Sequence, residues 1–299
     1  MAILDWTVRD FAKAKEGKEF LRQHFDFSKF PAPKLGSPVE LFKGCDAAVV
    51  GTAFDILLPL LICRQNKLKI DPEAQRLYWL STKELRTFNK SIELPETFLN
   101  LAIKRAFESH RSFSWATKSP RSRSNQSLRE ALRLLSKLAG SIKWETVNVS
   151  RASLGTFASL DLLLDRTAVE VKTVKDAGHH SEHTAQLISY HLLSRLPSVK
   201  KEGVVIDSIG VYYARHGVLT TTSIDDLRRS EKEDLDAVAA KLYESFIRWA
   251  VNKRYADYDS PFKATFLKNQ LKLGLFSAGL RPGANIRQTR TSRSKARSE

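Results

Sequence analysis

The stretch from residue 158 to residue 190 constrains the fold more than any other part of the chain. It reads ASLDLLLDRTAVEVKTVKDAGHHSEHTAQLISY and contains two apolar runs separated by the turn-like residues 165–167. Two such runs around a polar interruption predict a β-hairpin. Charged groups inside apolar strands cost stability unless they are paired or bound to a metal. The three charged residues within the runs, Asp161, Glu170 and Lys172, therefore indicate chemistry rather than folding.

The alternation of side chains along a strand places these charges relative to one another. Glu170 and Lys172 are two residues apart, so they point to the same face of the second strand, predicted over residues 168–174. A two-residue loop brings Asp161 to that face as well, whereas a three-residue loop needs a bulge or a bend to do so. Asp165 is a second acid nearby, which we interpret as a structural turn residue. The prediction is two carboxylates and an ammonium group gathered on one face of the sheet.

The chain is strongly basic, with 49 Lys and Arg against 33 Asp and Glu, a formal net charge of +16 in 299 residues. Such an excess indicates nucleic acid as the first choice of partner and an anionic membrane surface as the second. A solvated basic surface without a polyanionic partner is the remaining interpretation. At this length the chain can form one large domain, or a main domain with additions.

Other classes of protein fit the sequence less well. Two cysteines, Cys45 and Cys63, make neither a disulfide framework nor a zinc cluster. The first residues lack the pattern of a secretory signal. The longest apolar run, residues 47–63, is interrupted and falls short of the roughly 20 apolar residues that span a bilayer. We expect a core helix there, no membrane association and a cytoplasmic protein.

Changes in composition divide the chain into five parts. Residues 1–115 form a mostly helical accessory region, with helices expected at 8–23, 46–64, 71–86 and 95–110. The parts that follow are a basic linker over 116–126, a core over 127–225, C-terminal helices over 226–280 and a disordered basic tail over 281–299. A long amphipathic pattern predicts a helix over 224–253.

The core has the predicted element order α-β-β-β-α-β-β. Apolar spacing predicts helices at 127–139 and 182–195. Strands are predicted at 142–149, at the two arms of the hairpin, at 208–214 and at 218–222. A turn is expected at 176–178. This order predicts an α/β fold, with a mixed sheet and helices on its faces.

The segment between residues 109 and 126, SHRSFSWATKSPRSRSNQ, interleaves cations with aromatic residues and contains no acid. Arg and Lys bind phosphates, and aromatic rings stack on exposed bases. A flexible basic loop is an equally good interpretation. The candidate nucleic-acid contacts are Arg111, Trp115, Lys118, Arg121, Arg123 and, outside this segment, Lys175.

The charged hairpin residues fit the hydrolysis of a phosphodiester bond. That reaction needs an activated water and a group that stabilises the charge of the transition state, and Mg²⁺ serves both needs. Asp161 and Glu170 supply the oxygen ligands that Mg²⁺ or Mn²⁺ prefers, and the carbonyl of Val171 is a natural third ligand. Lys172 can orient the attacking water or balance the developing negative charge.

An Asp on one strand followed by Glu-x-Lys on the next, within an α-β-β-β-α-β order, resembles the PD-(D/E)xK nuclease superfamily. In the following helix, the run QLISY resembles the Gln-x-x-x-Tyr motif of the RecB-like and Cas4-like branch. Its Gln186 and Tyr190 are one helical turn apart, so they share a helix face. The resemblance covers about residues 127–222 and does not extend to the N-terminal third.

This resemblance implies a restriction-endonuclease-like fold and a Mg²⁺-dependent nuclease that acts on DNA, with RNA as the alternative substrate. It implies a role in defence, repair or recombination. The residues it assigns are Asp161, Glu170 and Val171 as metal ligands, with Lys172, Gln186 and Tyr190 completing the catalytic set. Glu130 matches the further acid that the helix before the sheet often contributes. A Glu in the first turn of a helix also interacts favourably with the helix dipole without any catalytic function. Both roles, active-site acid and dipole partner, therefore stay open for Glu130.

Two other functions fit the same residues. The first is a nucleic-acid-binding or assembly module that keeps the nuclease fold without turnover. Binding that falls steeply with salt but is insensitive to divalent metal would favour it. The second is a nuclease subunit that acts only beside a protein partner such as a helicase, which would be inactive alone and active in the complex.

The histidines near the hairpin do not have the spacing of a zinc site. His179, His180 and His183 straddle a loop–helix junction, without a nearby Cys or a paired carboxylate at zinc spacing. We interpret these three as helix-start or phosphate contacts. His191 and His216 are interpreted as structural residues.

Overall fold

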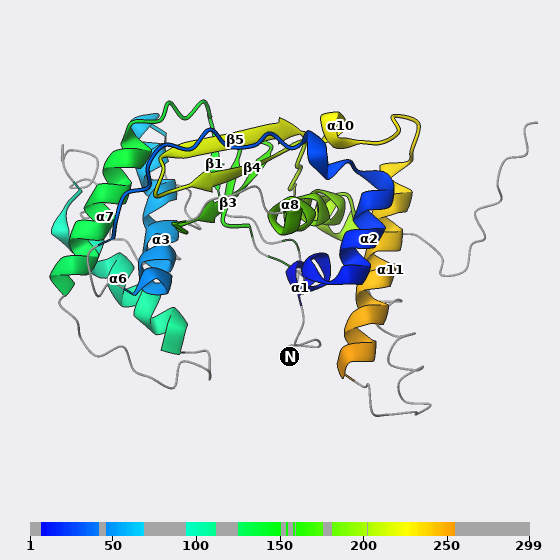
Figure 1. Ribbon diagram of the computed structural model, residues 1–299, viewed down its shortest axis with the longest axis horizontal. Helices are drawn as coiled ribbons and strands as arrows, with labels where there is room; N and C mark the ends of the chain where they lie inside the picture. Colours follow the sequence, from blue (N-terminus) through cyan, green and yellow to red (C-terminus); the bar gives the residue numbers. More distant parts are fainter. Residues whose placement is uncertain are drawn as a thin grey trace, which may run out of the picture.

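A five-stranded mixed sheet forms the centre of the described chain (Figure 1). The computed structural model describes residues 7–41, 46–68, 94–111, 125–150, 154, 158, 160–175, 181–201 and 203–254. The strands lie side by side in sequence order: β1 (Val149–Ser150), β2 (Leu162–Leu164), β3 (Thr167–Lys172), β4 (Ser208–Tyr213) and β5 (Val218–Ser223). Neighbours are antiparallel except β3 and β4, which are parallel and are connected by α8 (Ser181–Ser194). The predicted class, α/β with a mixed sheet, is confirmed.

Two groups of helices flank the sheet (Figure 1). One group contains α3 (Ala47–Gln65), α6 (Glu96–Arg111) and α7 (Asn125–Gly140). The other contains α1 (Val8–Lys13), α2 (Lys15–His24), α8 and α11 (Leu235–Arg254). Shorter helices, α9 (Pro197–Lys200), α10 (Ile224–Leu227) and the 3₁₀ helix η1 (Phe27–Lys29), accompany the second group. The buried apolar side chains accordingly form two clusters, and the helices of the predicted accessory region contribute to both.

The strand β3 belongs to both clusters because its side chains alternate. Val169 and Val171 lie in the cluster that contains α3, α6 and α7, whereas Ala168 lies in the cluster that contains α8. The helix α3 approaches closely just beyond β3, where a Cβ added to Gly51 would lie 2.7 Å from the hydroxyl of Thr173. This helix is long and apolar enough to cross a membrane by composition, but 61% of its apolar window is buried, and it packs against α6 and α7.

The hairpin has the two-residue loop that aligns the charges. β2 and β3 pair with Leu162 opposite Val169, and Asp165 and Arg166 make the turn, with Asp165 at φ 51°. Asp tolerates this left-handed conformation better than most residues. The carboxylate of Asp165 accepts hydrogen bonds from the backbone N–H groups of Asn148 (2.8 Å) and Val147 (3.2 Å). Asp165 is therefore a structural residue in this fold.

The strand predicted over 142–149 is much shorter than expected, since only Val149 and Ser150 form β1. The hydrogen bonds to Asp165 explain part of the difference, because they take backbone donors that a strand ladder would use. Trp144 is buried and donates its ring N–H to the carbonyl of Ala139, which turns the chain back toward the end of α7.

The helix predicted over 8–23 is two helices, α1 and α2, because the backbone is extended at Ala14 (ψ 157°). The second helix folds back against the first. A Cβ at Gly17 would lie 2.0 Å from the carbonyl oxygen of Phe11, so only glycine allows this contact. Apolar residues keep helical spacing across Ala14, so the sequence pattern did not predict the break.

The long helix predicted over 224–253 is also divided, into α10 and α11. Asp234 caps α11, since its carboxylate accepts from the backbone N–H of Asp236 at 2.9 Å. Arg228 stabilises the intervening loop by donating to the carbonyls of Glu231 and Glu233, both at 2.8 Å. The predicted helix at 71–86, the turn at 176–178 and the tail at 281–299 lie outside the described residues.

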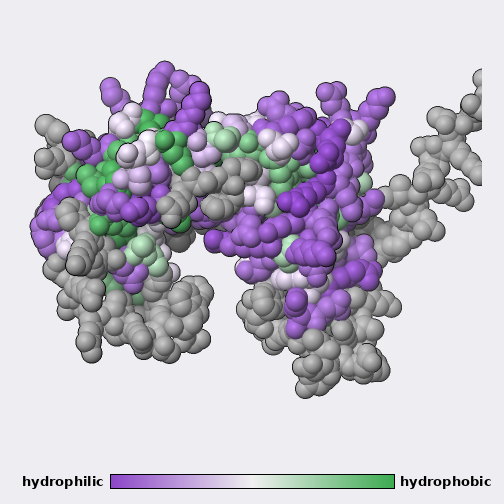
Figure 2. All heavy atoms as spheres, viewed as in Figure 1, coloured by the Kyte–Doolittle hydropathy of each residue, from purple (hydrophilic) through white to green (hydrophobic). Residues whose placement is uncertain are grey.

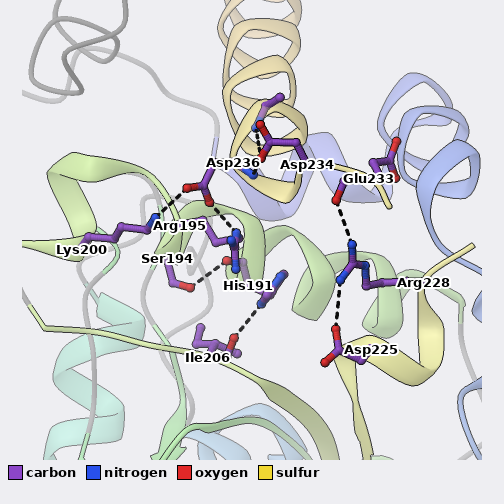
Figure 3. Close-up of polar contacts among 11 residues, drawn as sticks. His191, Ser194, Arg195, Lys200, Ile206, Asp225, Arg228, Glu233, Asp234 and Asp236 are labelled. Atoms are coloured by element: carbon purple, nitrogen blue, oxygen red, sulfur yellow. Dashed lines mark hydrogen bonds and ion pairs between the residues drawn. The ribbon is translucent and has the colours of Figure 1, made fainter. Parts of the chain in front are cut away.

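Polar contacts fasten the C-terminal half of α8 to its surroundings, as Figure 3 shows. Arg195 and Lys200 donate to the two carboxylate oxygens of Asp236 at the start of α11, at 2.7 and 2.9 Å. The ring Nδ1 of buried His191 lies 2.6 Å from the carbonyl oxygen of Ile206, and must carry a proton because a carbonyl only accepts. The helix that follows β3 is thus firmly held, and His191 has the structural position predicted for it.

Candidate active site

The hairpin register places Asp161 beside the central charged residues of β3. The pairing of β2 and β3 ends with Leu162 opposite Val169, and Asp161 lies at a bend just before β2, next to the Glu170–Val171 part of β3. The side chain of Asp161 accepts a hydrogen bond from the backbone N–H of Val171 at 3.1 Å. Asp161 therefore points toward the segment that contains Glu170 and Lys172, as the two-residue loop requires.

The carbonyl of Val171 points to the same side of β3 as Asp161. Along a strand, the N–H and C=O of one residue point to one side, and successive residues alternate. The Lys172 carbonyl accepts from the N–H of Ala214, which follows β4, whereas the Val171 N–H donates toward β2, to Asp161. The Val171 carbonyl therefore also faces the Asp161 side, where sequence reasoning placed a third oxygen ligand.

Glu170 is a buried carboxylate whose two oxygens are both engaged. Its side chain is 3% exposed, and Oε1 lies 2.5 Å from the ammonium nitrogen of Lys172, itself only 13% exposed. Oε2 accepts from the side-chain amide of Gln186 at 2.7 Å. Burying a carboxylate costs several kcal/mol unless such partners are present, so these contacts allow the charge to remain on the face next to α8.

Gln186 and Tyr190 face this carboxylate from α8, as their spacing predicts. The Gln186 amide nitrogen also donates to the hydroxyl oxygen of Tyr190 at 2.9 Å. Burial, and then the charge of Glu170, raise the pKa of Tyr190 above its ordinary value, so the phenol keeps its proton. Because the Tyr190 oxygen accepts from Gln186, its own proton points elsewhere and can serve a further acceptor. The Gln186 side-chain oxygen is buried and has no hydrogen-bond partner within the described residues.

Arg9 reaches the same carboxylate from α1, and nothing in the sequence predicted this. Its guanidinium lies 3.8 Å from Oε1 of Glu170, and its side chain is 44% exposed. Lys13, one turn further along α1, has its pKa lowered by burial and then by the charges of Arg9 and Lys172. Figure 2 shows a largely hydrophilic surface over the α1 and α2 side of the molecule. The four-residue spacing of Arg9 and Lys13 is visible in the sequence, but no local pattern connects them with Glu170, which lies far along the chain.

Glu130 is not brought to this site. It lies in α7, in the group of helices on the other side of the sheet, and its carboxylate accepts from the side-chain amide of Gln126 at 2.7 Å. In the described part of the chain, no three His, Cys, Asp or Glu side chains gather as a metal-binding group. The first-turn interpretation is wrong as well, because α7 begins two residues earlier than predicted and Glu130 lies beyond its first turn, so its carboxylate has no helix-dipole role there.

The other predicted contacts fall away from the site or outside the described ranges. Lys175 pairs with Glu40 at 2.7 Å, and its carbonyl lies 3.0 Å from Nε2 of His216, so it helps to hold residues 36–40 against the sheet. His216 is structural, since its Nδ1 also lies 2.8 Å from the carbonyl of Gly36. The residues outside the described ranges are Cys45, Trp115, Lys118, Arg121, Arg123, His179 and His180, and the side chain of Arg111 at the end of α6 is not described.

The donor set can be tested against the cation that the family resemblance implies. Two carboxylates and one carbonyl face a common region, and oxygen ligands of this kind suit Mg²⁺, which keeps several of its waters. A carboxylate has about four acceptor positions, so the contacts made by Glu170 do not exhaust it. The buried, unpartnered oxygen of Gln186 lies beside Glu170 and adds a further polar atom. The residues present therefore fit a single hard cation bound mainly by Asp161, Glu170 and the Val171 carbonyl.

Comparisons of this chain with protein-family models, with curated proteins and with solved structures found no match.

Proposed function

We propose that this chain is a Mg²⁺-dependent nuclease that hydrolyses phosphodiester bonds in DNA and has a core of the PD-(D/E)xK kind. The observation that carries the proposal is the alignment of Asp161 with the Glu170–Lys172 segment across the two-residue hairpin. The order α7-β1-β2-β3-α8-β4 supports it. The formal net charge of +16 supports a polyanionic substrate.

Asp161, Glu170 and the Val171 carbonyl would hold Mg²⁺ or Mn²⁺. When bound, such an ion supplies a Lewis acid and lowers the pKa of a coordinated water, which makes that water a better nucleophile. The chain positions these ligands in advance, because the Val171 N–H orients Asp161 and the Gln186 amide orients Glu170. Pre-positioned ligands reduce the reorganisation that the reaction requires.

Three further side chains act on the substrate or on the ligands in this proposal. Lys172 carries its positive charge on the same face as Glu170, where it can stabilise negative charge on the phosphate being cleaved. Tyr190 keeps its proton and can donate it in a hydrogen bond to a phosphate oxygen. Gln186 contacts both Glu170 and Tyr190, so it holds the carboxylate and the phenol in fixed relation.

One observation favours a second candidate, a nucleic-acid-binding module without turnover. Both oxygens of Glu170 already accept contacts from groups of the chain itself, namely Lys172, Arg9 and Gln186. In a protein without turnover, the charge of Glu170 would be neutralised by such contacts alone, with no bound metal. A nuclease subunit that requires a helicase-type partner would have the same residues in the same places, and it is distinguished only by activity in the complex.

A cleavage panel with matched variants tests the proposal. The full chain is incubated with linear duplex, circular duplex and single-stranded DNA and with RNA, in Mg²⁺, Mn²⁺ or EDTA. We expect divalent-dependent cleavage of DNA by the wild type, and a loss of about a thousandfold or more in Asp161→Asn, Glu170→Gln and Lys172→Ala.

The control is Asp207→Asn, which also removes one carboxylate near β3 and β4. Asp207 pairs with Arg166 at 2.6 Å at the opposite end of the strands, and both side chains are largely exposed. We expect it to cleave like the wild type, and all variants should keep cooperative thermal unfolding. Absence of cleavage of every substrate, with DNA binding retained in EDTA, would contradict a nuclease that acts alone. Absence of cleavage beside a helicase-type partner as well would establish the binding module.

A further inference from the structure

The helix α1 is held rigidly against the candidate site. Val8, Phe11 and Ala12 are buried in the same apolar cluster as α8 and α11. The ring of Phe11 lies 5.6 Å from that of Trp249 on α11. Thr7 and Asp10 form a capping box that fixes the first turn. The polar side chains of α1 are therefore presented from a fixed support beside α8 (Figure 1).

Arg9 and Lys13 are four residues apart, so they lie on one face of α1. Arg9 approaches Glu170 to 3.8 Å, which is an ion pair but not a hydrogen bond. Lys13 is half-buried: burial and then the charges of Arg9 and Lys172 lower its pKa, and the charges of Glu182 and Glu170 oppose this. The two side chains thus border the candidate site from α1.

The charges at this place do not balance. Lys172 takes the Glu170 oxygen that Arg9 also faces, and on α2 Lys18 is paired with Glu182 at 2.8 Å. Within the described residues, no carboxylate lies within 4 Å of the Lys13 ammonium. Like charges held together in a half-buried position repel one another, and Glu182 and Glu170 offset this repulsion at Lys13 only in part. Packing of α1 does not need this arrangement, because its buried face is apolar.

We infer that Arg9 and Lys13 form an anion-binding site that takes a phosphate group of the nucleic-acid backbone next to the Asp161–Glu170 site. A guanidinium binds two phosphate oxygens at once, and an ammonium adds a compact positive charge. Arg9 is exposed enough to turn from Glu170 to a ligand, which also relieves one of the contacts on Glu170. The identity of the anion rests on the proposed function, whereas the presence of an anion site rests on the charges alone.

Binding without cleavage tests this site separately from catalysis. The full chain is titrated against a short fluorescent single strand and a short duplex of DNA, with Ca²⁺ in place of Mg²⁺, at several salt concentrations. We expect Arg9→Gln/Lys13→Gln to lower the affinity about tenfold or more, and to reduce the slope of log affinity against log salt by about one to two.

The matched control for the Lys13 change is Lys15→Gln, the same Lys-to-Gln substitution at the first residue of α2. Lys15 is 85% exposed and, among the described residues, pairs with Glu19 on its own helix. We expect it to change the affinity less than about twofold.

Thermal unfolding separates a binding role from a structural one. Removing a like-charge contact should leave the melting temperature of Lys13→Gln at or above the wild-type value, while DNA binding weakens. A double variant with wild-type affinity and salt slope overturns the inference. A wild type that binds neither the single strand nor the duplex overturns it as well. Binding through Arg9 and Lys13 without any cleavage in Mg²⁺ would support this site and contradict a nuclease that acts alone. DNA cleavage by the wild type, together with unchanged affinity of the double variant, would support the nuclease and contradict this anion site.

Discussion

The two faces of β3 carry opposite kinds of side chain. Val169 and Val171 face an apolar cluster with α3 and α7, and they need nothing but close packing. Glu170 and Lys172 face α8, and the carboxylate there depends on partners from β3, α8 and α1. The contrast indicates that one face serves folding, and that the other carries charges that folding alone would not select.

The largest effect should come from moving a charge to the apolar face. Val169→Asp would bury a carboxylate among Leu162 and its neighbours without a partner, and we expect it to lower the free energy of unfolding by about 4 kcal/mol or more. Val147→Asp is the matched control, because Val147 is 82% exposed, and it should change stability by less than about 0.5 kcal/mol. Urea unfolding measures both. Similar losses at the two positions would contradict the division between faces.

A somewhat smaller effect should appear at His191, an ionisable group of α8 that is buried and hydrogen-bonded to a backbone carbonyl. Burial lowers the pKa of His191 to about 4 from 6.5, so between these values the unfolded chain binds a proton that the folded chain does not. Stability should therefore fall as the pH decreases from 6.5 to 4, by at most about 3 kcal/mol from this group. Urea unfolding across this range measures the change.

The comparison variant for that experiment is His191→Leu, which removes the titrating group. Its overall stability will be lower, because the carbonyl of Ile206 loses its donor. Its dependence on pH between 6.5 and 4 should nevertheless be flatter than that of the wild type. An unchanged slope would show that other groups control the acid sensitivity.

The smallest effect should come from removing the central ion pair as a unit. Glu170→Leu alone leaves the ammonium of Lys172 buried without its carboxylate, and should cost about 3 kcal/mol. The double variant Glu170→Leu/Lys172→Met should cost no more than about 1 kcal/mol or be stabilising, because buried ion pairs are often replaceable by apolar groups. A double variant much less stable than the single one would mean that folding itself requires the ion pair. The presence of these charges would then no longer indicate a catalytic function.

Local patterns predicted the elements that carry the motif. Apolar runs predicted β3 and β4, and apolar residues at helical spacing predicted α7 and α8 to within a few residues. The mutual contact of Gln186 and Tyr190 followed from their spacing on a helix. The side of β3 on which Asp161 lies followed once the loop was taken as two residues long. These features depend on residues close in sequence, so short-range periodicity is sufficient for them.

Other features depended on contacts that periodicity does not report. The break between α1 and α2 arises where Gly17 lets one helix fold onto Phe11, although the apolar spacing runs through it. The strand before the hairpin is short because Asp165 takes its backbone donors. Glu130 was matched by its position in the order of elements, but α7 lies in the helix group on the other side of the sheet.

The sequence by itself determined the hairpin, the shared face of Glu170 and Lys172, and the Gln186–Tyr190 pair, since strand and helix geometry relates neighbouring residues directly. Only the tertiary structure decided that Arg9 contacts Glu170 and that Lys13 lies near both, because these residues are far apart in the sequence. This arrangement is created when the apolar side of α1 packs between α8 and α11, and the burial of that side determines where its charges point.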